Sequence, residues 1–197
     1  MIITERTYQV LKYLAIAVVI APVFWLAYEG FVPERGPGDT AATAGDRAFA
    51  DGYYDRALRE YRTALERDPE NRHALLGKAG TYVQMERYDE ALASYAQFIE
   101  RYPDFAGAYA NRGIALDRMG RYEDALEDYD RALTLDTSVA DGPGWLTRFL
   151  HMGPEGQPTV ADRADYIREQ LALPEDERQL YDPEQDRAQR VYTQRAD

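Results

Sequence analysis

The sequence YDRALREYRTALERDP at residues 54–69 recurs twice further along the chain. It returns as YDEALASYAQFIERYP at residues 88–103 and as YEDALEDYDRALTLDT at residues 122–137, each time 34 residues later and without a gap. A fixed period of this length indicates one supersecondary unit repeated in series, because each unit buries its apolar face only against a neighbour.

Each copy has the spacing of an amphipathic helix. Tyr54, Leu58, Tyr61 and Leu65 lie three or four residues apart, so they share one face. Pro69 disfavours a helical residue before it and therefore ends the first copy. The positions that the three copies share are Tyr54, Tyr88 and Tyr122, then Ala57, Ala91 and Ala125, then Leu58, Leu92 and Leu126, then Tyr61, Tyr95 and Tyr129.

Another helix precedes each copy. The stretches at about 40–50, 72–85 and 106–119 carry it, and each has a small residue at the same offset, which lets two helix backbones approach closely. These small residues are Gly45, Ala79 and Gly113. Gly52 and Gly120 fall in the turns between the two helices, and Glu86 takes that place in the middle copy. The sequence therefore predicts three helix-turn-helix pairs.

In its repeat length and in these small and aromatic positions, the chain resembles the tetratricopeptide repeat (TPR) family over about residues 38–138. The resemblance implies an all-α solenoid of three repeats in residues 39–138, at about 38–71, 72–105 and 106–139. It also implies a concave surface that holds a peptide or helix of another protein, and it implies no catalysis.

In the family, the first helix of each pair supplies the concave surface. Carried over by alignment, the partner-binding groove consists of Ala42, Asp46, Phe49, His73, Leu76, Gly80, Val83, Ala110, Ile114, Asp117 and Arg118. Its small and apolar side chains favour a hydrophobic ligand, either a partner helix or peptide or the protein's own tail. Asp117 and Arg118 are expected to be solvated charges. Family members that grip a C-terminal carboxylate use basic residues and asparagine here, whereas Asp46 would repel a carboxylate.

Residues 1–31 are predicted to form a cytoplasmic stub and a transmembrane signal-anchor helix. Residues 10–28 supply an apolar span of nineteen residues if Lys12 reaches toward the headgroups, and about 20 are needed. The alternative is a cleaved signal peptide. Positive charge before the span favours a cytoplasmic N-terminus in the inner membrane, with the repeats in the periplasm. Residues 32–38 are expected to be a linker.

The chain after the repeats is predicted to cap them. Residues 139–173 are expected to form capping helices, with Trp145 and Phe149 covering the last repeat. Thr159 is expected to be the N-cap of a helix whose apolar side is Val160, Ala164, Ile167 and Leu171. Residues 174–197 form a charged C-terminal arm, which Leu180 and Tyr181 could anchor on another protein or along the repeats.

Composition excludes several functions. A formal net charge of -12 argues against binding to nucleic acid, and the chain has no cysteine and only two histidines. No catalytic or nucleotide-binding motif occurs, so we expect no enzymatic activity, cofactor, metal or small-molecule substrate. The sequence predicts a membrane-anchored scaffold for protein–protein interaction in the assembly, maturation or stabilisation of a larger membrane or cell-envelope complex. The alternative is a stoichiometric structural subunit of a membrane enzyme complex.

Overall fold

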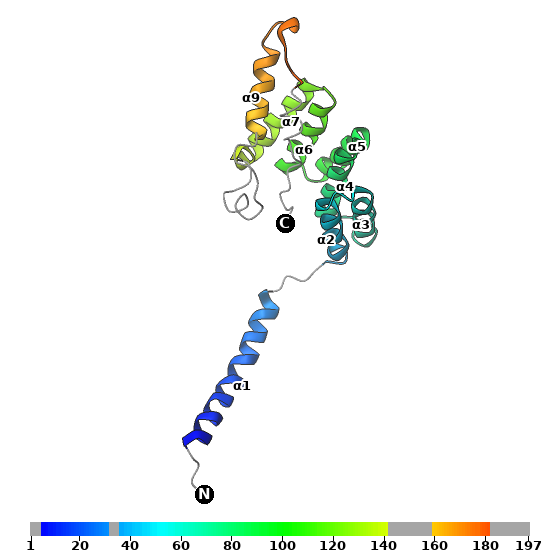
Figure 1. Ribbon diagram of the computed structural model, residues 1–197. Coiled ribbons are helices and arrows are strands. Elements are labelled where there is room, and N and C mark those ends of the chain that lie inside the picture. Colours follow the sequence, from blue (N-terminus) through cyan, green and yellow to red (C-terminus); the bar gives the residue numbers. More distant parts are fainter. Residues whose placement is uncertain (1–4, 32–35, 142–158, 182–197) are drawn as a thin grey trace. The chain divides into compact units, whose positions relative to one another are not determined.

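The computed structural model describes residues 5–31, 36–141 and 159–181 (Figure 1). The chain divides into two units, of which the first ends at Gly36 and the second begins at Pro37. Every regular element in the described ranges is helical, so the all-α prediction is confirmed for them.

The first unit contains one long helix, α1 (Glu5–Phe31), with Pro22 inside it. Side chains such as Val18, Val19 and Phe24 are exposed on this helix. Within the described residues, we find no helix with the length and apolar character that crossing a membrane requires. The helix is confirmed, but the predicted transmembrane span is not supported.

The second unit is built from three helix pairs, as the repeat pattern predicts. The pairs are α2 (Asp39–Ala50) with α3 (Tyr54–Arg67), α4 (Arg72–Gln84) with α5 (Tyr88–Arg101), and α6 (Ala106–Arg118) with α7 (Tyr122–Leu135). From α2 to α7, each helix packs on the next one along the chain, which is the contact pattern of a solenoid.

The turn inside each pair needs one residue with a left-handed backbone. Gly52 and Gly120 supply it in the first and third pairs, with φ angles of 78° and 74°. Glu86 adopts a φ of 58° at the equivalent place in the second pair. A residue with a Cβ atom pays a steric cost there, so the middle turn is the strained one of the three.

A buried tyrosine fills the space between the helices of each repeat. Tyr61, Tyr95 and Tyr129 occupy this position and are 2%, 0% and 0% exposed. Gly45 is required beside Tyr61, because a Cβ atom on it would lie 2.7 Å from the ring. Gly113 stands in the same relation to Tyr129. The shared glycines and tyrosines of the repeat therefore fit each other as a pair.

The three tyrosines differ in what their hydroxyl groups do, and this gives a stability prediction. The Tyr95 hydroxyl is buried without a hydrogen-bond partner among the described residues, whereas the Tyr129 hydroxyl donates to Asp117 Oδ2 at 3.1 Å. We expect Tyr95→Phe to leave the free energy of unfolding unchanged or slightly higher, and Tyr129→Phe to lower it by about 1–3 kcal/mol. Urea denaturation of the two variants measures the difference, and equal losses would contradict the assigned hydrogen bond.

A further helix, α9 (Val160–Leu171), covers the end of the repeats, between the short 3₁₀ segments η1 (Thr137–Asp141) and η2 (Glu175–Glu177). Thr159 is its N-cap, as predicted: its Oγ1 accepts from Asp162 N at 3.1 Å and Asp162 Oδ2 accepts from Thr159 N at 2.8 Å. Such a reciprocal capping box satisfies two backbone donors at the helix start. The predicted caps Trp145 and Phe149, and residues 182–197 of the arm, lie outside the described residues.

Candidate functional site

The accessible part of the predicted groove lies on α2 and α4. Four of its residues are partly exposed there, namely Asp46, Phe49, His73 and Leu76. Phe49 and Leu76 lie at the edge of two separate core clusters, and Phe49 also packs edge-on against Tyr54 at 5.6 Å between ring centres. This surface therefore offers apolar side chains to a ligand without being closed by the rest of the described chain.

Asp46 is the electrostatic centre of this surface. Its carboxylate Oδ2 lies 2.7 Å from Nε2 of His73, and its Oδ1 accepts a hydrogen bond of 2.7 Å from the Tyr61 hydroxyl. Burial, and then the neighbouring Asp46 charge, raise the pKa of the Tyr61 phenol, so this phenol is a permanent donor at neutral pH. The fold thus brings Asp46 and His73 together, although the sequence did not predict this contact.

The Asp46 carboxylate also remains open to solvent. Its side chain is 40% exposed and that of His73 is 33% exposed. A half-exposed carboxylate attracts a cationic group and repels an anionic one. The surface of repeats 1 and 2 therefore favours a ligand that is apolar and carries a basic group.

Three other predicted groove residues of the first two repeats are buried in helix contacts. Ala42 packs in a cluster with Ala74, and Val83 packs in a cluster with Ala115. Gly80 is buried as well. These residues support the neighbouring helices, so they do not offer a binding surface.

The third repeat differs, because the chain itself covers the predicted groove residues there. Ile114 is 2% exposed and packs in one cluster with Ala164 and Ile167 of α9. Ala110 is buried in a cluster with Val139 of η1. Of the predicted residues on α6, Arg118 keeps partial exposure. The sequence left two possible ligands for the groove, a partner peptide or helix and the protein's own tail. At the third repeat, it is the protein's own chain that covers the groove residues.

Asp117 is held in a buried ion pair rather than in solvent. Arg163 of α9 donates from Nε to Asp117 Oδ2 at 2.8 Å and from Nη2 to Asp117 Oδ1 at 2.7 Å. The side chains are 1% and 0% exposed. The expectation that Asp117 is a solvated charge is therefore wrong. Two parallel bonds of this kind fix the orientation of α9 on α6.

The burial of Arg163 could have been predicted from its position in the sequence, although the predicted apolar side of α9 did not include it. Arg163 lies three residues after Val160 and four before Ile167, and thus on the face that packs against the repeats. A charged residue within an apolar stripe implies a buried partner of opposite charge. The partner is 46 residues away, and helix spacing does not identify it.

The chain after α9 folds back along that helix. The Tyr166 hydroxyl donates to the carbonyl of Gln179 at 2.6 Å, and Arg163 Nη2 donates to the carbonyl of Leu180 at 3.2 Å. Leu180 packs against the cluster that contains Ile114 and Ile167. The predicted anchoring by Leu180 is therefore made along the repeats, whereas Tyr181 is exposed.

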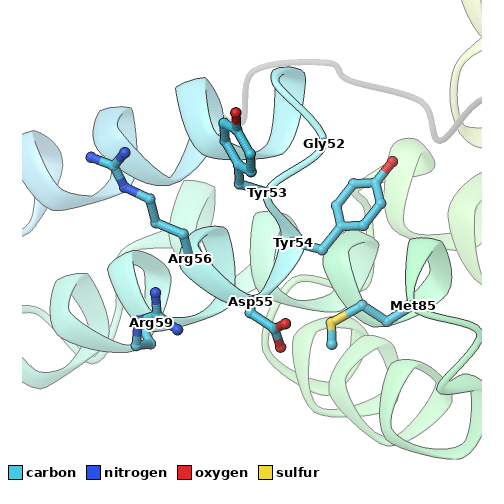
Figure 2. A pocket seen from close by; sticks show the side chains of 7 residues that line it. All are labelled: Gly52, Tyr53, Tyr54, Asp55, Arg56, Arg59 and Met85. Atoms are coloured by element: carbon cyan, nitrogen blue, oxygen red, sulfur yellow. The ribbon is translucent and has the colours of Figure 1, made fainter.

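A second feature lies at the turn between α2 and α3 and was not predicted. It is an open depression of about 680 Å³. Its lining residues are Gly52, Tyr53, Tyr54, Asp55, Arg56, Arg59 and Met85. Figure 2 shows the guanidinium groups of Arg56 and Arg59 on one side and the side chains of Tyr54 and Met85 on the other.

A metal centre does not occur in the part of the chain that the structure describes, since no group of three histidine or acidic side chains there is placed to hold an ion. Asp46 and His73 of the candidate site are partly exposed and are therefore accessible to a ligand.

Comparisons with known proteins agree with this architecture. The sequence profile of the tetratricopeptide repeat family matches residues 43–84 and 78–140. The fold is similar to that of the first TPR domain of the human RPAP3 protein, with 20% identity and a TM-score of 0.55 over 69% of this chain and 93% of that chain. The Sgt2 TPR domain from Aspergillus fumigatus gives 20% identity and a TM-score of 0.52 over 77% and 93% of the two chains.

The TPR2B domain of yeast Sti1, solved in a pHsp70 complex, is 26% identical, with a TM-score of 0.50 over 59% of this chain and 91% of that chain. A search of curated proteins gives no match. The period of 34 residues, the paired helices, the family profile and the solved structures all agree. Residues 43–140 therefore form tetratricopeptide repeats, and the domain is a module of the kind that mediates contacts between proteins.

Proposed function

We propose that this protein is a scaffold that binds a peptide or helix of another protein on the concave surface of its first two repeats. The observation that carries the proposal is the contrast between the two ends of the predicted groove. Asp46, Phe49, His73 and Leu76 stay accessible, while α9 and the segment after it cover the third repeat. A groove that is closed at one end and open at the other suits a short segment.

The ligand is an apolar segment with a basic residue. Phe49 and Leu76 provide apolar contacts, and Asp46 provides a carboxylate for a lysine, an arginine or an amino terminus. One similar domain, the first TPR of Spaghetti, was solved with the HSP90 peptide SRMEEVD, which is acidic. An acidic peptide would face repulsion from Asp46, so the ligand proposed here has the opposite charge.

The biological role that we infer is the assembly, maturation or stabilisation of a larger complex, to which the repeats would bring a partner. No catalytic group is needed for it. The location in the cell envelope, with the repeats outside the cytoplasmic membrane, remains a prediction from the sequence. Fractionation of cells that produce the full chain, compared with a chain lacking residues 1–36, tests that location independently of the groove.

Site-specific crosslinking tests the groove. With a photoreactive phenylalanine at Leu76, we expect a covalent adduct to one partner protein, and with the same probe at the exposed Glu169 on α9 we expect none. Asp46→Lys in the Leu76 probe protein should abolish the adduct, because the charge that selects the basic ligand is reversed. Mass spectrometry identifies the attached chain. Adducts only to residues 159–197 of the same molecule would show that the protein's own tail fills this end too.

A further inference from the structure

The second helices of the three repeats carry opposite charges at matching positions. Arg56, Arg59 and Arg62 lie three residues apart on α3, and all three are exposed. The equivalent positions two repeats later, on α7, hold Asp124, Glu127 and Asp130, which are also exposed. We call these sets the arginine stripe and the acidic stripe. Residues three apart on a helix are neighbours, so each stripe is one continuous charged surface.

The contrast extends to the whole helices. α3 has four arginines and three acidic residues, a net charge of +1, whereas α7 has one arginine and five acidic residues, a net charge of −4. On α5, between them, the matching positions are Glu90, Ala93 and Ala96. The second helices of the first and third repeats therefore differ by five charges, in a chain with a net charge of -12.

Neighbouring residues satisfy these charges only in part. Among the described residues, no ion pair involves Arg56, Arg59 or Glu127, and Arg62 donates to the Tyr82 hydroxyl at 3.1 Å. The other two acidic groups have exposed partners. Asp124 pairs with Arg121 at 2.5 Å and Asp130 with Arg168 at 2.6 Å, and exposed pairs of this kind contribute little.

Each stripe also borders a depression. Arg56 and Arg59 line the one in Figure 2, next to Tyr53, which is 62% exposed. Glu127 and Asp130 line a second depression of about 420 Å³ between α6 and α7, together with Arg112 and Arg131. Tyrosine and arginine are enriched in the central parts of protein interfaces. Each stripe therefore combines exposed charged side chains with a hollow surface.

We propose that a second copy of this chain docks on the face made by α3, α5 and α7, with the arginine stripe of each copy on the acidic stripe of the other. Because the two stripes occupy equivalent helices of one solenoid, an antiparallel arrangement satisfies both contacts at once. Such an arrangement is a closed two-fold dimer. It uses a different set of helices from the groove and does not depend on the proposed ligand.

The test is the mass of the full chain in solution, measured in detergent so that α1 is covered. We expect wild-type protein to be dimeric at low ionic strength. At about 0.5 M salt the association constant of the dimer should fall roughly tenfold, because salt screens exposed charges. A wild-type chain that stays monomeric at low ionic strength overturns the proposal. Masses that grow beyond a dimer overturn the closed arrangement.

Charge reversal makes the test specific. The basic-to-acidic variant is Arg56→Glu, Arg59→Glu, Arg62→Glu, and the acidic-to-basic variant is Asp124→Arg, Glu127→Arg, Asp130→Arg. Each should be monomeric by itself, because like charges then face each other, and a one-to-one mixture should restore the dimer. Arg67→Glu with Arg101→Glu, exposed on the same helices, is the matched control and should stay dimeric. Either variant dimerising alone, or a mixture that stays monomeric, excludes this pairing; circular dichroism verifies that each variant is folded.

Discussion

Arg163→Ala is expected to lower the free energy of unfolding by about 3–5 kcal/mol. The arginine is 1% exposed and its partner Asp117 is 0% exposed. Removing the guanidinium leaves a carboxylate that has lost two short hydrogen bonds and has no access to water. The Tyr129 hydroxyl, at 3.1 Å, does not compensate for the lost positive charge. Urea denaturation of the full chain measures the loss.

Two variants separate the buried charge from other effects of the change. Arg168→Ala removes a half-exposed arginine of the same helix, which pairs with Asp130 and Asp165, and should cost no more than about 1 kcal/mol. Arg163→Met combined with Asp117→Leu removes both charges and should recover most of the stability. If Arg163→Ala and Arg168→Ala had equal effects, the ion pair would not be buried as described. Hydrogen exchange should show the loss first in α9.

Tyr95→Ala is the other change with a large expected effect, a loss of about 3–5 kcal/mol. Tyr95 is fully buried at the centre of the middle repeat, in one cluster with Leu58, Val83 and Ala115. Its truncation leaves a cavity between helices of three repeats. Because a solenoid is stabilised by contacts between neighbours, we expect the single unfolding transition to separate into two.

The matched control for this prediction is Tyr53→Ala. Tyr53 is a tyrosine of the same chain, but it is 62% exposed, and exposed substitutions change stability by about 0.5 kcal/mol or less. Calorimetry of both variants gives the comparison. A stable, single-transition Tyr95→Ala protein would mean that the middle repeat does not couple the outer two.

The repeats could be predicted from the sequence because their determinants are local and recur. Gly45 and Gly52 each act within one helix pair, and three copies of the same spacing make the pattern unmistakable. The N-cap at Thr159 was equally predictable, since its partner Asp162 is three residues away. When two contacting residues are only a few positions apart, their spacing in the sequence is enough to predict the contact.

The burial of the predicted groove residues in the third repeat could not be predicted from the sequence. The family alignment identified the residues of α2, α4 and α6 correctly as equivalent, but it could not show that α9 covers Ile114 and Asp117. The contact between Arg163 and Asp117 joins residues 46 positions apart. The membrane span likewise rested on hydropathy, which measures composition over a window and gives no account of what surrounds a helix.

The position of α9 sets a limit on how the array can grow. This helix packs on α7 in the way that α4 packs on α3, so it takes the place that the first helix of a fourth unit would need. Its outer face carries the exposed charges of Asp165 and Glu169, which oppose the packing of another apolar layer on the helix itself. Stacking of molecules end to end into a fibre is therefore disfavoured at this terminus, and contact between molecules is left to the sides of the array.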